Sequence, residues 1–272
     1  MSNGDRTPQA GEVLTHPAYG LLRPVTDTAS VLLCDNPGLM TLDGTNTWVL
    51  RGRGSSEMVV VDPGPDDDAH LERLAALGKI SLVLISHRHG DHTDGIDQIV
   101  DRTGAVVRSV GSGFQRGLGG SLTDGEVIDA AGLSITVLAT PGHTADSVCF
   151  LVDDVVLTAD TVLGRGTAVI DKEDGSLRDY LESLRRLHGL GSRRVLPGHG
   201  PDLGDLHEVS EMYLAHREQR LEQVRGALRE IGEDATARQV VEHVYTDVDE
   251  KLWEAAESSV QAQLDYLLEL RR

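Results

Sequence analysis

The chain has few cysteines, few aromatic residues and no long apolar run. Its two cysteines, Cys34 and Cys149, do not form a CxxC pair, which argues against a disulfide framework. Residues 1–12 are polar and lack the apolar run of a signal peptide, and no stretch approaches the length of a transmembrane span. We therefore expect a cytoplasmic protein that does not contact a membrane.

Basic residues are also scarce. Lys and Arg number 25 against 44 Asp and Glu, so the formal net charge is -19. Such a body repels phosphate backbones at long range, and no basic or aromatic track for single-stranded nucleic acid is evident. We expect no duplex DNA partner. A local basic rim or bound metal ions can still override the average field, so charge does not exclude RNA.

The densest cluster of potential metal ligands is the hexapeptide His87-Arg88-His89-Gly90-Asp91-His92. The apolar run from Ser81 to Ser86 predicts a buried strand before it, and Asp91 to Asp101 predicts a helix after it. Three imidazoles and a carboxylate at this spacing cannot share one helix face, but they suit a loop around a cation. Nitrogen and oxygen ligands favour zinc, with Fe or Mn as alternatives.

Four further apolar runs each end at a potential metal ligand. The runs are 57–61, 133–139, 155–159 and 194–196, and the side chains that follow them are Asp62, His143, Asp160 and His199. Gly and Pro beside these residues form tight turns that hold a side chain over a sheet edge. Ligands from separate strand ends can therefore converge on one site.

These five motifs, in this order, resemble the metallo-β-lactamase superfamily of binuclear hydrolases. The resemblance implies that Asp62 orients a histidine without binding metal, and that Asp91 also orients the attacking hydroxide or moves its proton. It implies two divalent ions, most simply Zn²⁺, held by seven side chains: His87, His89 and His143 on the first ion, Asp91, His92 and His199 on the second, and Asp160 between them.

Three segments resemble one branch of this superfamily, beta-lactamase-like protein 2, which includes endoribonucleases and is similar to thioesterases. They are Gly44 to Trp48, Asp160 to Thr167 and Tyr213 to Arg217. The similarity runs over nearly the whole chain from about residue 25. It makes Thr45, Asn46 and His216 candidates for the substrate side of the site, with turn formation as the alternative for the first two. Arg88 departs from the residues that related chains often carry there.

Alternating strands and helices from about residue 28 to 200 predict layered α/β architecture, with helices at 67–77 and 176–187. The resemblance sharpens this to a four-layer αββα sandwich. Three helices are expected after it, at 205–231, after the capping residue Thr236, and from about 249. We therefore predict a catalytic domain over 1–204 and a C-terminal helical, winged-helix-like domain over 205–272, which covers the body or forms a homodimer contact.

The leading hypothesis is a binuclear hydrolase whose metal-bridging hydroxide cleaves an ester, thioester or phosphodiester bond. The branch favours single-stranded RNA as substrate, whereas the acidic body favours a small acyl or thioester substrate. One alternative is an iron-dependent persulfide oxygenase on the same scaffold, which needs fewer than the seven ligands present here. Another is a nucleic-acid-binding regulator acting through the C-terminal helices, which the acidic tail opposes.

Overall fold

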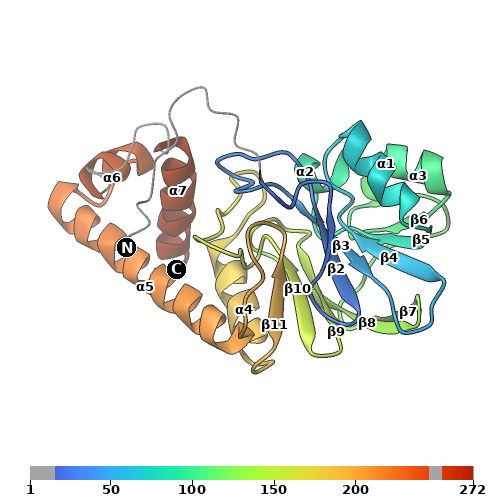
Figure 1. Cartoon of the computed structure of the whole chain (residues 1–272). Coiled ribbons are helices and arrows are strands. Elements are labelled where there is room, and N and C mark those ends of the chain that lie inside the picture. Colours follow the sequence, from blue (N-terminus) through green and yellow to red (C-terminus); the bar gives the residue numbers. More distant parts are fainter. Residues whose placement is uncertain (1–15, 245–252, 272) are drawn as a thin grey trace, which may run out of the picture.

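The computed structural model describes residues 16–244 and 253–271 and consists of two β-sheets packed face to face between helices (Figure 1). The first sheet has the order β1-β2-β3-β4-β5-β6, in which β4, β5 and β6 are parallel and the other neighbours antiparallel. Its strands are β1 (Leu22–Pro24), β2 (Ala29–Leu33), β3 (Asn46–Leu50), β4 (Glu57–Val61), β5 (Lys79–Leu84) and β6 (Val106–Arg108).

The second sheet has the order β11-β10-β9-β8-β7, antiparallel except for the parallel pair β10 and β11. Its strands are β7 (Val127–Ala130), β8 (Leu133–Ala139), β9 (Val148–Val152), β10 (Val155–Ala159) and β11 (Arg194–Pro197). The five apolar runs that end at potential ligands are all strands in the structure.

Alternation along the strands divides the apolar residues between two cores. Val59 and Val61 of β4 face the second sheet, where they join Phe150 and Leu157. Met58 and Val60 point the other way and pack with the helices that cover the first sheet. Because side chains alternate along a strand, a run that is apolar on both faces must be covered on both. This explains why both sheets are sandwiched.

Helices supply the outer layers and confirm the four-layer αββα prediction. The first sheet is covered by α1 (Asp68–Ala76) and α3 (Ile96–Thr103), and the second by α4 (Leu177–His188). The predicted helix from Asp91 to Asp101 is instead divided into α2 (Gly90–Thr93) and α3. The break lies at Gly95, whose amide donates to the carbonyl of Gly64 and which lies so close to that loop that a Cβ would be 2.9 Å from a backbone oxygen.

The C-terminal segment forms α5 (Leu206–Ile231), α6 (Ala237–Val244) and α7 (Trp253–Glu269). Thr236 caps α6 as predicted, since its hydroxyl accepts from the Gln239 amide at 3.3 Å. The predicted start of the third helix near 249 lies outside the described residues. Apolar side chains of α4, α5, α6 and α7 form one continuous core, so this tail packs on the catalytic body (Figure 1).

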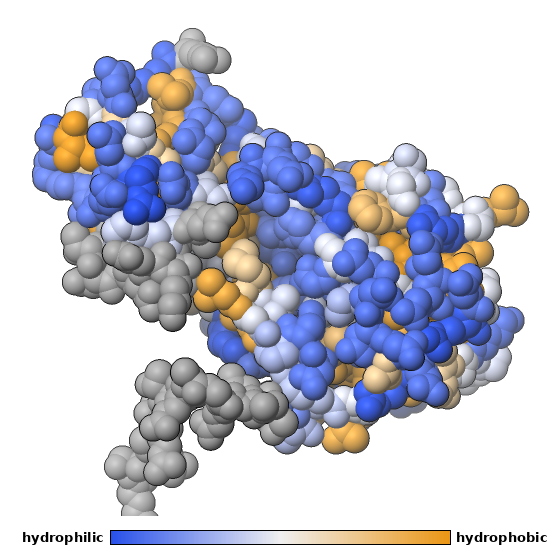
Figure 2. All heavy atoms as spheres, turned by 90° about the horizontal axis from the view of Figure 1, so that it is seen from above, coloured by the Kyte–Doolittle hydropathy of each residue, from blue (hydrophilic) through white to orange (hydrophobic). Residues whose placement is uncertain are grey.

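On the face in Figure 2, the surfaces of the sandwich and of the C-terminal helices are mostly hydrophilic, with small scattered apolar patches. Within the described residues, no helix combines the length and the apolar character that a membrane crossing requires.

His70 of α1 is a buried histidine outside the ligand clusters. It is 3% exposed, and its Nε2 lies 2.9 Å from the Thr47 hydroxyl of β3. Burial lowers the pKa of His70 to about 4, because a charged imidazole loses its hydration there. Protonation of this side chain therefore destabilises the packing of helix α1 on the first sheet.

We predict that replacing His70 by Gln reduces the acid sensitivity of the fold. The folded-state pKa of about 4 lies below the ordinary 6.5, so the contribution of His70 is intact above pH 6.5 and is lost as the pH falls toward 4. At about pH 5 the linked loss is about 2 kcal/mol. Urea unfolding at about pH 7 and pH 5 should show that loss in the native chain and not in His70→Gln; equal losses in both would contradict it.

Candidate metal centre

Seven side chains from four separated segments converge at one edge of the sandwich. These side chains form two groups. Within each group, the potential ligand atoms all lie within 4.8 Å of one another. The first group is His87, His89, His143 and Asp160, and the second is Asp91, His92 and His199. They follow β5, β8, β10 and β11, or lie on the short helix α2.

The first group surrounds a small space lined by nitrogens. His89 Nδ1 lies 3.0 Å from His87 Nε2 and 3.0 Å from His143 Nε2. Three imidazole nitrogens that point at one spot cannot all satisfy each other, because a neutral ring has one donor and one acceptor. They can all donate lone pairs to one cation.

The second group has the same character. His92 Nε2 lies 3.2 Å from His199 Nε2, and the Asp91 carboxylate lies 3.4 Å from the former and 3.1 Å from the latter. Both imidazoles are fully buried or nearly so, whereas the Asp91 side chain is 27% exposed. Asp91 therefore lies on the open side of this group.

Asp160 lies between the two groups. Its Oδ2 is 3.7 Å from His143 Nε2 and 3.4 Å from His199 Nε2, and its Oδ1 is 3.5 Å from His92 Nε2. That buried Oδ1 has no hydrogen-bond partner within the described residues. A buried carboxylate oxygen without a donor is costly, and a bound cation would satisfy it. The residues present therefore fit a pair of metal ions.

Each of the five imidazoles also has a contact on the nitrogen that faces away from the centre. The Asp62 carboxylate lies 2.9 Å from His92 Nδ1 and accepts from both the amide and the hydroxyl of Ser86. His89 Nε2 lies 3.0 Å from Asp171. His87, His143 and His199 are held by the Ser86 hydroxyl and by the carbonyls of Val169 and Gly44. These contacts orient the rings and select the nitrogen that faces inward.

Charge in the cluster is strongly coupled. Burial lowers the pKa of His87 well below its ordinary value, and the neighbouring His92 adds to this. Burial also disfavours charge on His199, but Asp160 and Asp91 outweigh it and raise the pKa of His199 to about 11. The carboxyl of Asp91 has a lowered pKa, because contacts with His199 and His92 outweigh burial. Ions that enter the second group therefore displace a proton, which higher pH favours.

Two family descriptions match the sequence. Residues 40–199 match the metallo-beta-lactamase superfamily, and residues 236–272 match the beta-lactamase associated winged helix domain. The chain belongs to the metallo-beta-lactamase superfamily. The match confirms both the fold and the resemblance that the five motifs predict.

Individual proteins that resemble this chain in sequence or in fold are consistent with this family assignment. A beta-lactamase-like protein 2 homolog of Caenorhabditis elegans is 31% identical over 83% of this chain and 79% of its own length. An atrochrysone carboxyl ACP thioesterase of Aspergillus fumigatus is 33% identical over 74% of this chain and 64% of its own. A beta-lactamase domain protein from Burkholderia ambifaria has the same fold, with a TM-score of 0.80 at 21% identity, over 94% of this chain and 90% of its own. The family and the thioesterase relative support an enzyme of the hydrolase class.

Thr45 and Asn46, predicted on the substrate side, lie behind His199 in this metallo-β-lactamase fold. Thr45 is fully buried, and its hydroxyl accepts from the Asn36 amide. The Asn46 amide donates to the carbonyls of Pro197 and Gly200 and so holds the loop that carries His199. These contacts hold the loop in place, and a substrate contact for either residue stays a prediction.

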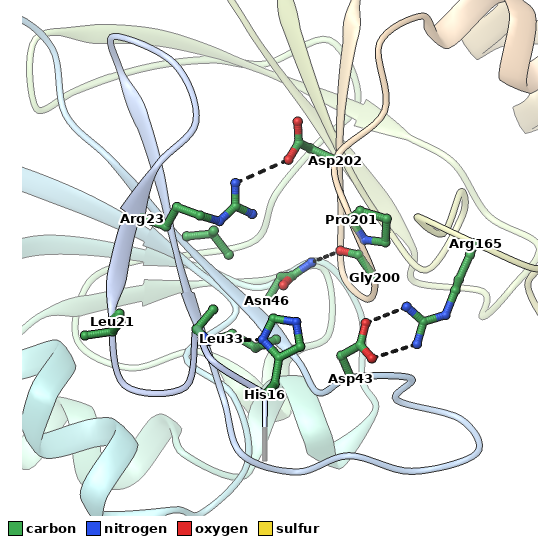
Figure 3. Close-up of a pocket in the computed structure, with 12 residues that line it drawn as sticks. His16, Leu21, Arg23, Leu33, Asp43, Asn46, Arg165, Gly200, Pro201 and Asp202 are labelled. Carbon is green, nitrogen blue, oxygen red and sulfur yellow. Dashed lines mark hydrogen bonds and ion pairs between the residues drawn. The ribbon is translucent and has the colours of Figure 1, made fainter. Parts of the chain in front are cut away.

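Asn46 also lines a cavity of about 470 Å³ beside that loop (Figure 3). Figure 3 shows the ion pairs Arg23–Asp202 and Asp43–Arg165 at its walls, so most of its charges are already paired.

His216 lies apart from the ligand cluster, on α5, where it lines a second cavity with Arg217. Arg88 points away from the cluster and pairs with Asp171, Glu173 and Asp174. It therefore anchors the loop whose Asp171 contacts His89.

The sequence did not predict two residues that contact the outward-facing nitrogens of the histidines, nor the role of one glycine. Ser86 and Asp171 have no motif of their own, and Asp171 reaches His89 across 82 residues. Gly198 is part of a noted Pro-Gly-His-Gly turn, but its role depends on contact: a Cβ there would lie 2.5 Å from Asp160 Oδ1 and 3.0 Å from His92 Cε1. The one feature of the sequence that could have indicated this role is the position of Gly198 next to the ligand His199.

We predict that Gly198→Ala weakens metal binding roughly tenfold or more, because the new methyl group must displace Asp160 or His92. Competition with a chromogenic chelator measures the affinity. Gly204→Ala is the matched control, since a Cβ there meets no atom within 4 Å. Equal affinities for the two variants would show that the glycine is not needed at the centre.

Asp62→Asn and Asp171→Asn should weaken different ions. The first removes the charge behind His92 and the second the charge behind His89. Each loss should cost about 10- to 100-fold in affinity for the ion on that side. Stepwise metal titration separates the two sites, and weakening of the same step by both variants would refute the assignment.

Proposed function

We propose that the chain is a binuclear metal-dependent hydrolase that takes two divalent ions, with zinc preferred over iron or manganese, and cleaves thioesters. The observation that carries this is the place of Asp160: its Oδ2 lies within 4.0 Å of His87, His143 and His199, and its Oδ1 lies 3.5 Å from His92, so this carboxylate contacts both imidazole groups. A buried carboxylate between two imidazole groups is what a shared ligand of two cations requires. The set contains nitrogen and oxygen but no sulfur, which suits zinc in a hydrolytic role.

When bound, two such ions supply an activated water near neutral pH and a Lewis acid for the carbonyl oxygen. The chain's own residues do the rest. Asp91 is ionised and lies on the open side of the cluster, where its carboxylate orients the attacking water and accepts its proton. The outer contacts on Asp62, Asp171 and the backbone keep the rings from turning. No serine or cysteine nucleophile is required.

The thioester is preferred over RNA for two reasons. A relative at 33% identity carries the name of an ACP thioesterase, and the net charge of -19 opposes a polyanion. Both cysteines are free and buried, which suits a reducing compartment, and we keep the cytoplasm as the proposed location. Cleavage of single-stranded RNA remains the competing outcome of the same assay.

Metal-loaded protein should contain two ions per chain and hydrolyse acyl-pantetheine or acyl-CoA. Elemental analysis and thiol release measure these two properties. Substantially fewer than two ions in fully active protein would reject the binuclear form. Cleavage of unstructured RNA without thiol release would reject the thioesterase.

Asp91→Asn should lower the rate of hydrolysis by roughly 10²- to 10⁴-fold at matched metal content, because the carboxamide cannot accept the proton. Asp94→Asn is a control on the same turn, since the Asp94 side chain is exposed and outside both ligand groups. A rate for Asp91→Asn close to that of the control would remove Asp91 from the mechanism.

A further inference from the structure

A polar cavity of about 190 Å³ lies where the C-terminal helices meet the catalytic body. His216, Arg217 and Arg220 line it from α5, Ser259 and Gln263 from α7, and residues 167–169 from the connection between β10 and α4. That connection lies beside α7, where the Ser258 hydroxyl donates to the carbonyl of Ile170 (Figure 1). We call it the α5–α7 cavity.

The wall of this cavity is shared with the metal centre. The Val169 carbonyl accepts from His143 Nδ1 at 2.6 Å, and the carbonyl of its neighbour Ala168 accepts from the Arg217 guanidinium. One short segment therefore touches a ligand of the first metal on one side and Arg217 on the other.

Arg217 is a buried cation at the wall of this cavity. It is 4% exposed, its guanidinium lies 4.8 Å from the Tyr180 ring centroid, and its Nε has no hydrogen-bond partner in the part of the chain that the structure describes. Among the side chains that the structure describes, no carboxylate forms an ion pair with it. Buried charges in proteins are paired or bind ions, so an unpaired guanidinium with a free donor at a cavity wall indicates an anionic ligand.

The α5–α7 cavity differs in charge from three other cavities of the molecule. Each of those has carboxylates beside arginine in its wall: Asp43 and Asp202 with Arg23 and Arg165, Glu233 and Asp234 with Arg271, or Asp205 and Glu208 with Arg165. Among its described residues, the wall of the α5–α7 cavity contains Arg217, Arg220 and His216 and no carboxylate. In a chain with a net charge of -19, the buried Arg217 guanidinium at this wall marks a place where a phosphate can bind.

Gln263 adds a second recognition element. It is 2% exposed, its amide nitrogen donates to the Ser259 carbonyl, and its Oε1 has no hydrogen-bond partner among the described residues. That oxygen can accept a hydrogen bond from an N–H or O–H on the same ligand. The cavity thus suits a phosphate ester that also carries a hydroxyl or amide.

We propose that Arg217, with Arg220 beside it, binds the phosphate of a 4′-phosphopantetheine thioester, while the thioester itself reaches the metal centre. This rests on the proposed thioesterase function and names its substrate class. The pantetheine arm is a flexible chain with a hydroxyl and amides next to its phosphate, which meets the requirements of Arg217 and Gln263. The arm separates phosphate from thioester, so the two groups bind on opposite sides of residues 167–169.

The test compares acyl-4′-phosphopantetheine with acyl-pantetheine in the metal-loaded full chain. The native protein should favour the phosphorylated substrate roughly tenfold or more in kcat/KM, as a charge-assisted contact predicts. Arg217→Met, which keeps an apolar side chain over Tyr180, should bring this ratio close to one. Arg178→Met is the matched control, because Arg178 also lies over a ring, that of Tyr266, but is exposed and paired with Glu269; its ratio should stay at the native value.

Ser259→Asp keeps the test decisive if Arg217→Met does not fold. It adds a carboxylate to the cavity wall without removing a contact of Arg217, and it should abolish the phosphate preference. A native ratio near one, or an unchanged ratio in both variants, would overturn the proposal, as would an effect confined to RNA cleavage. Acyl-CoA and an acyl carrier protein both present this phosphate. A lower rate of the Arg217→Met variant with one of these two substrates supports the phosphate subsite and identifies which of them carries the acyl group.

Calorimetry with 4′-phosphopantetheine and with pantetheine separates this proposal from the function. Arg217-dependent binding of the phosphorylated compound without thioester hydrolysis would support the subsite and refute the thioesterase. Hydrolysis of acyl-pantetheine together with equal binding of both compounds would support the thioesterase and refute the phosphate subsite.

Discussion

The structure depends on one electrostatic constraint: a carboxylate, Asp160, is enclosed among imidazoles with little access to solvent. Its interactions with His92 and His199 are strong enough to reverse the effect of burial on both sides, lowering the pKa of the acid and raising that of His199 to about 11. The cluster can persist only if every ring is held from behind, because a ring that turned away would leave that charge unpaired.

The backbone around the site shows how closely these groups are packed. Asp62 and Ala159 both have positive φ angles, of 55° and 44°, although neither is glycine. Each lies at the end of a strand, where the chain must turn sharply to direct a carboxylate at the centre. Such conformations cost free energy and persist only where the surrounding contacts over-determine them. Gly198 also allows this close packing, because the absence of a side chain leaves room for Asp160.

The C-terminal helices are part of this arrangement. They continue the apolar core of α4, and through Arg217 they hold the segment that supports His143. A metal ligand on the sandwich and a cation on α5 are therefore linked through two adjacent carbonyls.

The sequence by itself determined the local features. Apolar runs followed by Asp62, His143, Asp160 and His199 predicted the strands and the ligand types, because alternation and turn chemistry act over a few residues. Tertiary structure alone decided the rest: that Asp171 reaches His89, that Gly95 ends α2 against the loop at Gly64, and that Arg217 is buried without an acid. Those facts depend on distances between segments far apart in the chain, and no local pattern encodes such distances.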